Sequence, residues 1–140
     1  MRLHTIALAA LLPLGAIPAA NAADLKITIT GAGPTGRVMA KLFATADSFE
    51  KMNPAIAMLS LAPSDGQVSV TIGNLPPGRY AVAAFQDVKG TGKLESNLLG
   101  IPTEPYGFSN DAAGGMGPPG FDQAAFTIGA DGGATTLHLR

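Results

Sequence analysis

Short segments in which apolar and polar residues alternate, separated by clusters of glycine and proline, restrict the fold of this sequence most. Residues 25–30 and 68–72 are the clearest examples. Successive side chains of a β-strand point to opposite faces, so this period is typical of strands with one buried face. Residues 80–85 are instead apolar throughout, which predicts a central strand covered on both faces.

Four further segments, residues 37–43, 56–61, 125–128 and 135–139, complete a predicted set of about seven strands. A helix competes for 37–43, because Val38, Leu42, Ala46 and Phe49 also fit a period of 3.6 residues. The glycines and the proline before this segment, and the lack of a capping residue there, favour the strand.

Three local features are predicted between and beside these strands. One helical turn competes for residues 121–125, and 129–133 are predicted to form the loop of a hairpin. Tyr80 follows a Leu-Pro-Pro-Gly corner, where a tyrosine of an immunoglobulin-like sandwich bonds its hydroxyl to upstream backbone. An ordinary core aromatic is the alternative for Tyr80.

Seven short strands separated by turn residues indicate an all-β protein: a single antiparallel β-sandwich, immunoglobulin- or prealbumin-like, with one long ordered loop. Val70 and Val82 are the predicted core positions. We expect one domain over residues 23–140, which is near the commonest domain size.

Residues 1–22 have the pattern of a secretory signal peptide. Arg2 precedes an apolar run over residues 6–17, and the small residues Ala20 and Ala22 follow. The run is shorter than the roughly 20 residues that cross a bilayer, which argues against a membrane anchor. We expect cleavage near Ala22 and a periplasmic or secreted product, with no membrane span once the signal is removed.

Composition excludes several classes of function. The chain has no cysteine, which removes disulfides, thiolate metal sites and cysteine nucleophiles. Its formal net charge is −1 and it has no basic cluster, so nucleic acid is not an expected partner. We expect a partner in the cell envelope or outside the cell.

Catalytic motifs are missing from the sequence. His138 is the single histidine after the predicted cleavage, and its alternation with Leu137 and Leu139 places it on an exposed face. The sequence has no Gly-x-Ser-x-Gly, His-Glu-x-x-His or Gly-Lys-Ser motif. We therefore expect a protein that is not an enzyme, although a carboxylate pair such as Asp87 and Asp111 stays open as an alternative.

From residue 75 onward the sequence resembles a known family. LPPGRYAVAAF at 75–85 and LGIPTEPYGFSND at 99–111 are the longest motifs, and 87–95, 117–119 and 124–126 continue the likeness. They resemble the bacterial exported proteins of domain-of-unknown-function family 2141. The resemblance implies an exported sandwich related in outline to prealbumin-like and carboxypeptidase-regulatory-like domains, and it implies no activity.

Residues 87–95 occupy a place where that family resembles a calcium loop. Asp87, Gly92 and Glu95 match the pattern, whereas Lys89 and Thr91 stand where oxygen ligands belong. The twelfth place holds a leucine in place of a bidentate acid. A glycine-rich hairpin is therefore favoured over a metal site at Asp87 and Glu95, and calcium is the one cofactor left open.

Residues 97–120 form a loop that is unusually long for a compact domain. As a recognition loop it would present Glu104, Tyr106, Phe108, Asn110 and Asp111. The alternative is an Ω-like loop whose two aromatic residues pack onto the edge of a sheet.

The function predicted from these patterns is an exported, non-catalytic module. It binds a protein, a glycan or a small ligand through residues 87–97 and 97–120. The alternative is a structural or assembly module of the cell envelope, without a small-molecule ligand, that pairs an edge strand with a partner.

Overall fold

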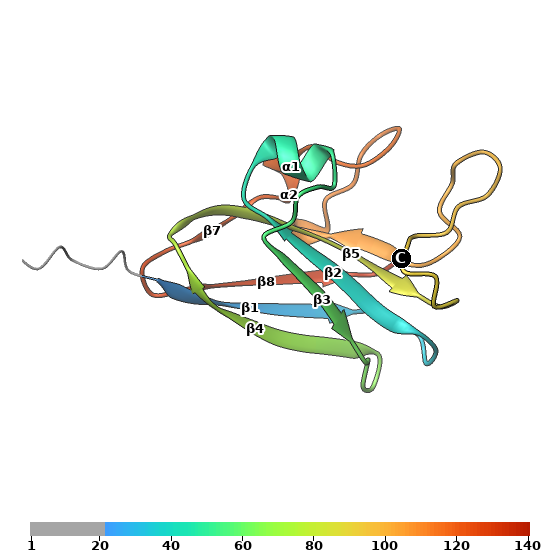
Figure 1. Ribbon diagram of the computed structural model, residues 1–140, viewed down its shortest axis with the longest axis horizontal. Helices are drawn as coiled ribbons and strands as arrows, with labels where there is room; N and C mark the ends of the chain where they lie inside the picture. Colours follow the sequence, from blue (N-terminus) through green and yellow to red (C-terminus); the bar gives the residue numbers. More distant parts are fainter. Residues whose placement is uncertain (1–21) are drawn as a thin grey trace, which may run out of the picture.

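The computed structural model describes residues 22–140, so that residues 1–21 of the predicted signal peptide lie outside the described residues. Two β-sheets pack face to face (Figure 1), which confirms the predicted all-β sandwich. The three-stranded sheet has the order β4-β1-β8, with β1 Ala23–Thr30, β4 Gln67–Leu75 and β8 Gly133–His138.

The second sheet has five strands in the order β3-β2-β5-β6, with β7 also paired to β5. Its strands are β2 Arg37–Phe43, β3 Ala57–Leu61, β5 Gly78–Asp87, β6 Tyr106–Phe108 and β7 Phe126–Ile128. Three short helical segments complete the fold: α1 Ala46–Glu50, the 3-10 turn η1 Ser109–Asp111 and α2 Phe121–Ala124.

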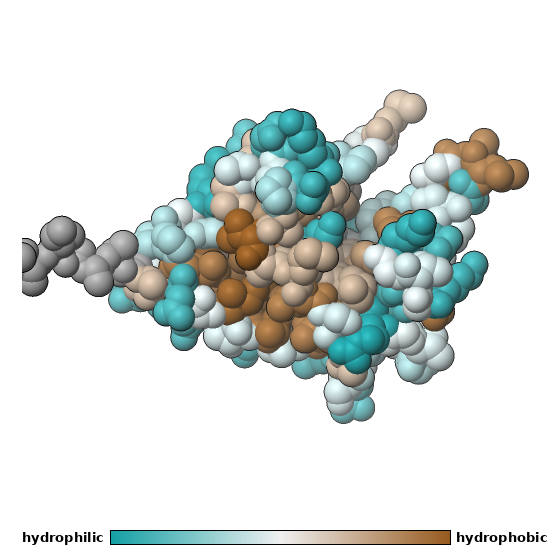
Figure 2. Space-filling model, viewed as in Figure 1, coloured by the Kyte–Doolittle hydropathy of each residue, from teal (hydrophilic) through white to brown (hydrophobic). Residues whose placement is uncertain are grey.

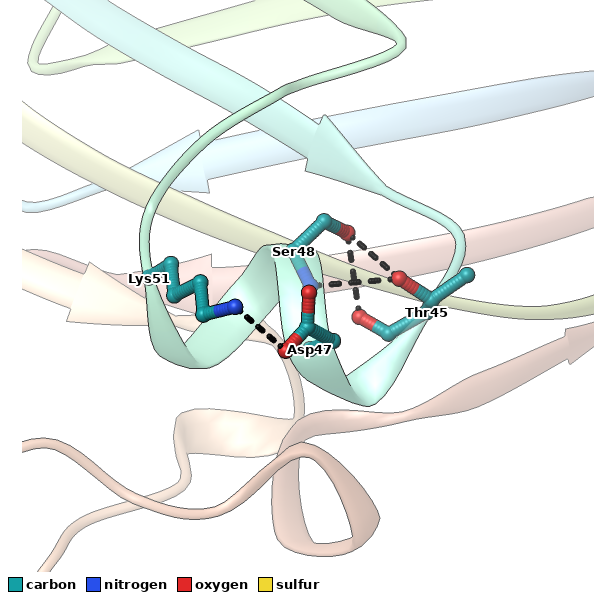
Figure 3. A network of polar contacts seen from close by, with 4 residues as sticks. All are labelled: Thr45, Asp47, Ser48 and Lys51. Atoms are coloured by element: carbon teal, nitrogen blue, oxygen red, sulfur yellow. Dashed lines mark hydrogen bonds and ion pairs between the residues drawn. The ribbon is translucent and has the colours of Figure 1, made fainter.

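All seven predicted strands are present in the described part of the chain. The competing helix over residues 37–43 is wrong, because this segment is β2. A short helix does follow it: Thr45 accepts a hydrogen bond from the backbone N–H of Ser48 at 3.1 Å and starts α1 (Figure 3). Asp47 and Lys51 pair at 2.8 Å along this helix. The helical turn considered for 121–125 is confirmed as α2.

Two details of the prediction need correction at the end of the chain. The sandwich is not wholly antiparallel, since β1 and β8 pair in parallel. Residues 129–132 form a tight turn, but β7 pairs with β5 while β8 pairs with β1, so the predicted hairpin is wrong. The turn carries the chain from one sheet to the other. A Cβ on Gly132 would lie 2.7 Å from the carbonyl oxygen of Asp24, so the turn requires glycine there.

The main core lies between the two sheets. It is built from alternate residues of β1, β2, β4, β5 and β8. Val82 is fully buried in it, as predicted. Val70 is only partly buried, because β4 is an edge strand.

The tyrosine corner is confirmed. The hydroxyl of Tyr80 donates to the carbonyl oxygen of Pro76 at 2.5 Å, across the turn between β4 and β5. The bond fixes the start of β5, the central strand of the larger sheet.

None of the helices described within residues 22–140 combines the length and the apolar character needed to cross a membrane.

Candidate functional site

The outer face of the five-stranded sheet points away from the core and is divided into two halves. One half is covered by α1 and α2, which lie together over it in Figure 1. Phe49 of α1 packs edge-to-face on Phe43 of β2 at 5.6 Å and on Phe121 of α2 at 6.0 Å between ring centroids. These contacts make a second apolar cluster, which we call the covered half: Phe43, Phe49, Ala81, Phe108, Phe121 and Ala124.

No helix of residues 22–140 lies over the other half. Strand register places Met39, Phe85 and Tyr106 in one outward row, and Met58, Lys41 and Ala83 in the next. Met58 is 70% exposed. Figure 2 shows hydrophobic surface, in tan and brown, in the middle of the molecule over β2 and β3, below the hydrophilic surface of α1.

This uncovered half forms a groove of about 450 Å³, which we call the outer groove. Its floor is the outward residues of β2, β3 and β5. Its walls come from both loops singled out by the sequence, with Gly92, Lys93 and Leu94 on one side and Pro118 on another. Tyr106 and Phe108, two of the predicted site residues, line it as well.

Glu104 does not present the exposed polar tip that was expected. Its side chain is buried, and its carboxylate accepts hydrogen bonds from three backbone N–H groups, those of Val88 at 2.6 Å, Lys89 at 3.3 Å and Glu95 at 2.9 Å. A charged acceptor that satisfies three donors fixes the loop that forms one wall of the groove. Glu104 therefore positions this wall.

The Asp87 carboxylate is engaged by the backbone of its own loop. Both carboxylate oxygens of Asp87 accept backbone N–H groups of its own loop, from Thr91 at 3.0 Å and Gly92 at 2.9 Å. Glu95 takes part through its backbone N–H. Residues 22–140 contain no group of three or more acidic, histidine or cysteine side chains placed to hold a metal ion.

Ser109 and Asn110 tie the long loop to α2. The Ser109 hydroxyl is fully buried; it accepts from the backbone N–H of Val82 at 2.9 Å and donates to the carbonyl of Ala124 at 2.6 Å. The Asn110 amide donates to the carbonyl of Ala125 at 2.8 Å. The first part of the loop thus docks against the sheet, where Tyr106–Phe108 form β6.

Asp111 pairs with His138, on the far side of β6 from the outer groove. It accepts from the backbone N–H of His138 at 2.8 Å and lies 2.7 Å from the ring Nδ1. Burial raises the pKa of Asp111, but the hydrogen bonds from His138 and the charges of His138 and Arg140 outweigh it and hold that pKa below its ordinary value. His138 itself is exposed, as predicted.

A smaller hollow of about 350 Å³ opens at this pair. Its described lining contains no serine, threonine, cysteine or lysine, and its hydroxyl-bearing side chain is that of Tyr106.

The tip of the loop after β5 exposes aliphatic side chains. Leu98 and Leu99 are almost fully exposed, and the hydrophobic tip is visible at the right of Figure 2. The side-chain oxygen of Asn97 accepts the N–H groups of Leu99 at 2.9 Å and Ile101 at 3.0 Å, which fixes the turn.

Sequence reasoning missed the floor of the outer groove. Residues 80–85 were expected to be covered on both faces. On their outward face only Ala81 is covered, whereas Ala83 and Phe85 lie in the open half. Met39 and Lys41 alternate with the buried residues of β2. A methionine on the outward side of an internal strand was the available signal.

A family model described as "Uncharacterized protein conserved in bacteria (DUF2141)" matches residues 27–136. Searches of curated proteins and of solved structures return no significant match.

Proposed function

We propose that this chain, which belongs to the DUF2141 family, is a non-catalytic binding module that holds a small apolar ligand in the outer groove. The observation that carries the proposal is that one half of a continuous apolar sheet face is left without a cover. The match to the family supplies no activity, so the groove itself must carry the argument.

The dimensions of the groove support this proposal. Ligand sites in proteins span about 300–1,000 Å³ and are mostly apolar with a few polar groups, and the outer groove has about 450 Å³. Methionine side chains at Met39, Met52 and Met58 adapt to the shape of an apolar ligand. The wall fixed by Glu104 reduces the ordering cost of binding.

A neutral fluorescent probe tests the proposal. N-phenyl-1-naphthylamine should brighten on binding the protein, and Phe85→Ser should weaken its affinity about tenfold, because a buried aromatic contact is lost. Val88→Ser is the matched control, since Val88 follows the same strand and is exposed but lies outside the groove. Equal affinity for both variants, or no probe binding by the native protein, would reject the proposal.

We also propose that the module works outside the cytoplasm, on the basis of residues 1–22. Intact-mass measurement of the protein recovered from the periplasm or the medium should give a chain that begins at Ala23. Full-length protein retained in the cytosol would contradict this.

An assembly role is the second candidate, and the edge of the smaller sheet favours it. β4 is nine residues long, carries no charge and pairs on one side only, with β1. Exposed uncharged edges pair readily with another strand. If this role holds, sedimentation should give a mass that rises with concentration, and Ser69→Lys on β4 should abolish the rise while Thr136→Lys on the exposed face of β8 leaves it unchanged.

A further inference from the structure

Lys41 is an unusual residue for the place that it occupies. It lies on β2, an internal strand, between Met58 of β3 and Ala83 of β5 in the outward row. Its ammonium group donates to the carbonyl oxygen of Met52 at 3.2 Å. An ammonium has three donors, and this contact accounts for one of them.

The charge of Lys41 is not balanced nearby. Among residues 22–140, none of the ion pairs between basic and acidic side chains includes Lys41 or Lys93. These two lysines are the only charged residues in the described lining of the outer groove, which contains no aspartate or glutamate. A half-buried cation at an apolar surface is stabilised most by an anion that arrives with the ligand.

We infer that the outer groove binds an amphiphile with a carboxylate head group, that is, a medium- or long-chain fatty acid, and that Lys41 binds the carboxylate. This inference rests on the proposed function. The alkyl chain lies over the methionines and Phe85, where the groove is apolar, and the head group lies toward α1, where Lys41 contacts the carbonyl of Met52.

A carboxylate fits this charge better than a phosphate does. Phosphate sites in proteins gather several donors, often an arginine fork or a row of backbone N–H groups. The described lining has no arginine, and its half-buried cation is a single ammonium. One compact positive charge matches one carboxylate.

Calorimetric titration of the purified protein with decanoate and with decanol tests the inference, because the two probes differ in the head group alone. We expect the native protein to bind decanoate about tenfold more tightly than decanol, as one charge-assisted hydrogen bond provides. Lys41→Met should lower the affinity for decanoate to that for decanol and leave decanol binding unchanged. Lys26→Met, on the exposed face of β1 in the other sheet, is the matched control and should retain the preference.

Two further variants keep the test independent of any folding defect in Lys41→Met. Lys41→Arg retains the charge and should retain the preference for decanoate. Met58→Glu places a carboxylate beside Lys41 in the register and should remove that preference. Thermal melting by circular dichroism verifies that each variant is folded.

The possible failures are distinguishable. Equal affinity of the native protein for decanoate and decanol overturns the inference and leaves the proposed function standing. If neither probe binds, both are overturned. A groove filled by a second copy of the chain would also overturn both, and it would appear as a concentration-dependent mass that Met58→Glu abolishes.

Discussion

The two halves of the outer face of the five-stranded sheet differ in how deeply their side chains are buried. In the covered half, Phe43 and Ala81 are completely buried under the helices. In the outer groove, the same two strands present Met39 and Phe85 partly to solvent. The strands are apolar in both places, so the difference arises from the segments that the chain brings over them.

The cover depends on short helices with one aromatic residue each. Phe49 is the fourth residue of the five-residue helix α1, and its ring contacts rings from β2, β6 and α2. Such helices are too short to be stable alone, so their packing onto the sheet must stabilise them. In the part of the chain that the structure describes, the open half has walls from two loops and no covering helix, so its apolar side chains stay partly exposed.

Truncating one aromatic residue in each half tests this difference in burial most directly. Phe49→Ala should lower the free energy of unfolding by about 3–5 kcal/mol, because it leaves a cavity among three rings. Phe85→Ala should cost less than about 1.5 kcal/mol, because its ring is partly exposed. Urea denaturation measures both; similar losses would mean that the open half is structural core.

Removing the Glu104 carboxylate tests whether the wall of the groove is fixed by it. Glu104→Ala leaves three N–H groups without their acceptor and should cost about 3 kcal/mol. It should also weaken naphthylamine binding, whereas Phe49→Ala in folded protein should affect binding less. Stability and probe affinity that stay at native values would show that the wall forms without this carboxylate.

Ser109 provides the corresponding test on the covered half. Ser109→Ala removes the hydroxyl that joins β5 to α2 and should cost about 2 kcal/mol in urea denaturation. Because the groove floor is untouched, probe affinity should stay native. A parallel loss of probe binding would show that the two halves are coupled.

Tyr80→Phe measures how much a single hydrogen bond outside both halves contributes to the free energy of unfolding. It removes the donor to Pro76 and should lower the free energy of unfolding by about 1 kcal/mol with no change in probe affinity. An unchanged urea midpoint would mean that the corner does not contribute to stability.

The Asp111–His138 pair should have the smallest effect, and this effect should disappear in acid. The pKa of Asp111 is lowered from 3.8, so its contribution is present above that value and is lost as the pH falls through the lower pKa of the folded state. The stability difference between native protein and Asp111→Asn should therefore shrink as the pH falls through the lowered pKa of Asp111. A difference that grows on acidification would contradict the pairing.

Much of the fold could be predicted from the local pattern of apolar, polar and turn-forming residues. The alternation over residues 25–30 and 68–72 predicted β1 and β4, and Tyr80 after its proline corner predicted a bond that the structure contains. The errors share one cause. The hairpin at 129–132 and the exposed tip of Glu104 both depend on which distant strand or backbone group the chain meets.

The sequence alone determined which residues point the same way along each strand, because side-chain alternation is a property of neighbouring residues. Only the tertiary structure decided which outward faces are covered. Phe49 packs on Phe43 of β2 and on Phe121 of α2, which come from different parts of the chain, whereas Met39 and Lys41 line the outer groove. Burial is set by contacts between residues far apart in the chain, and the local periodicity of a strand contains no information about those contacts.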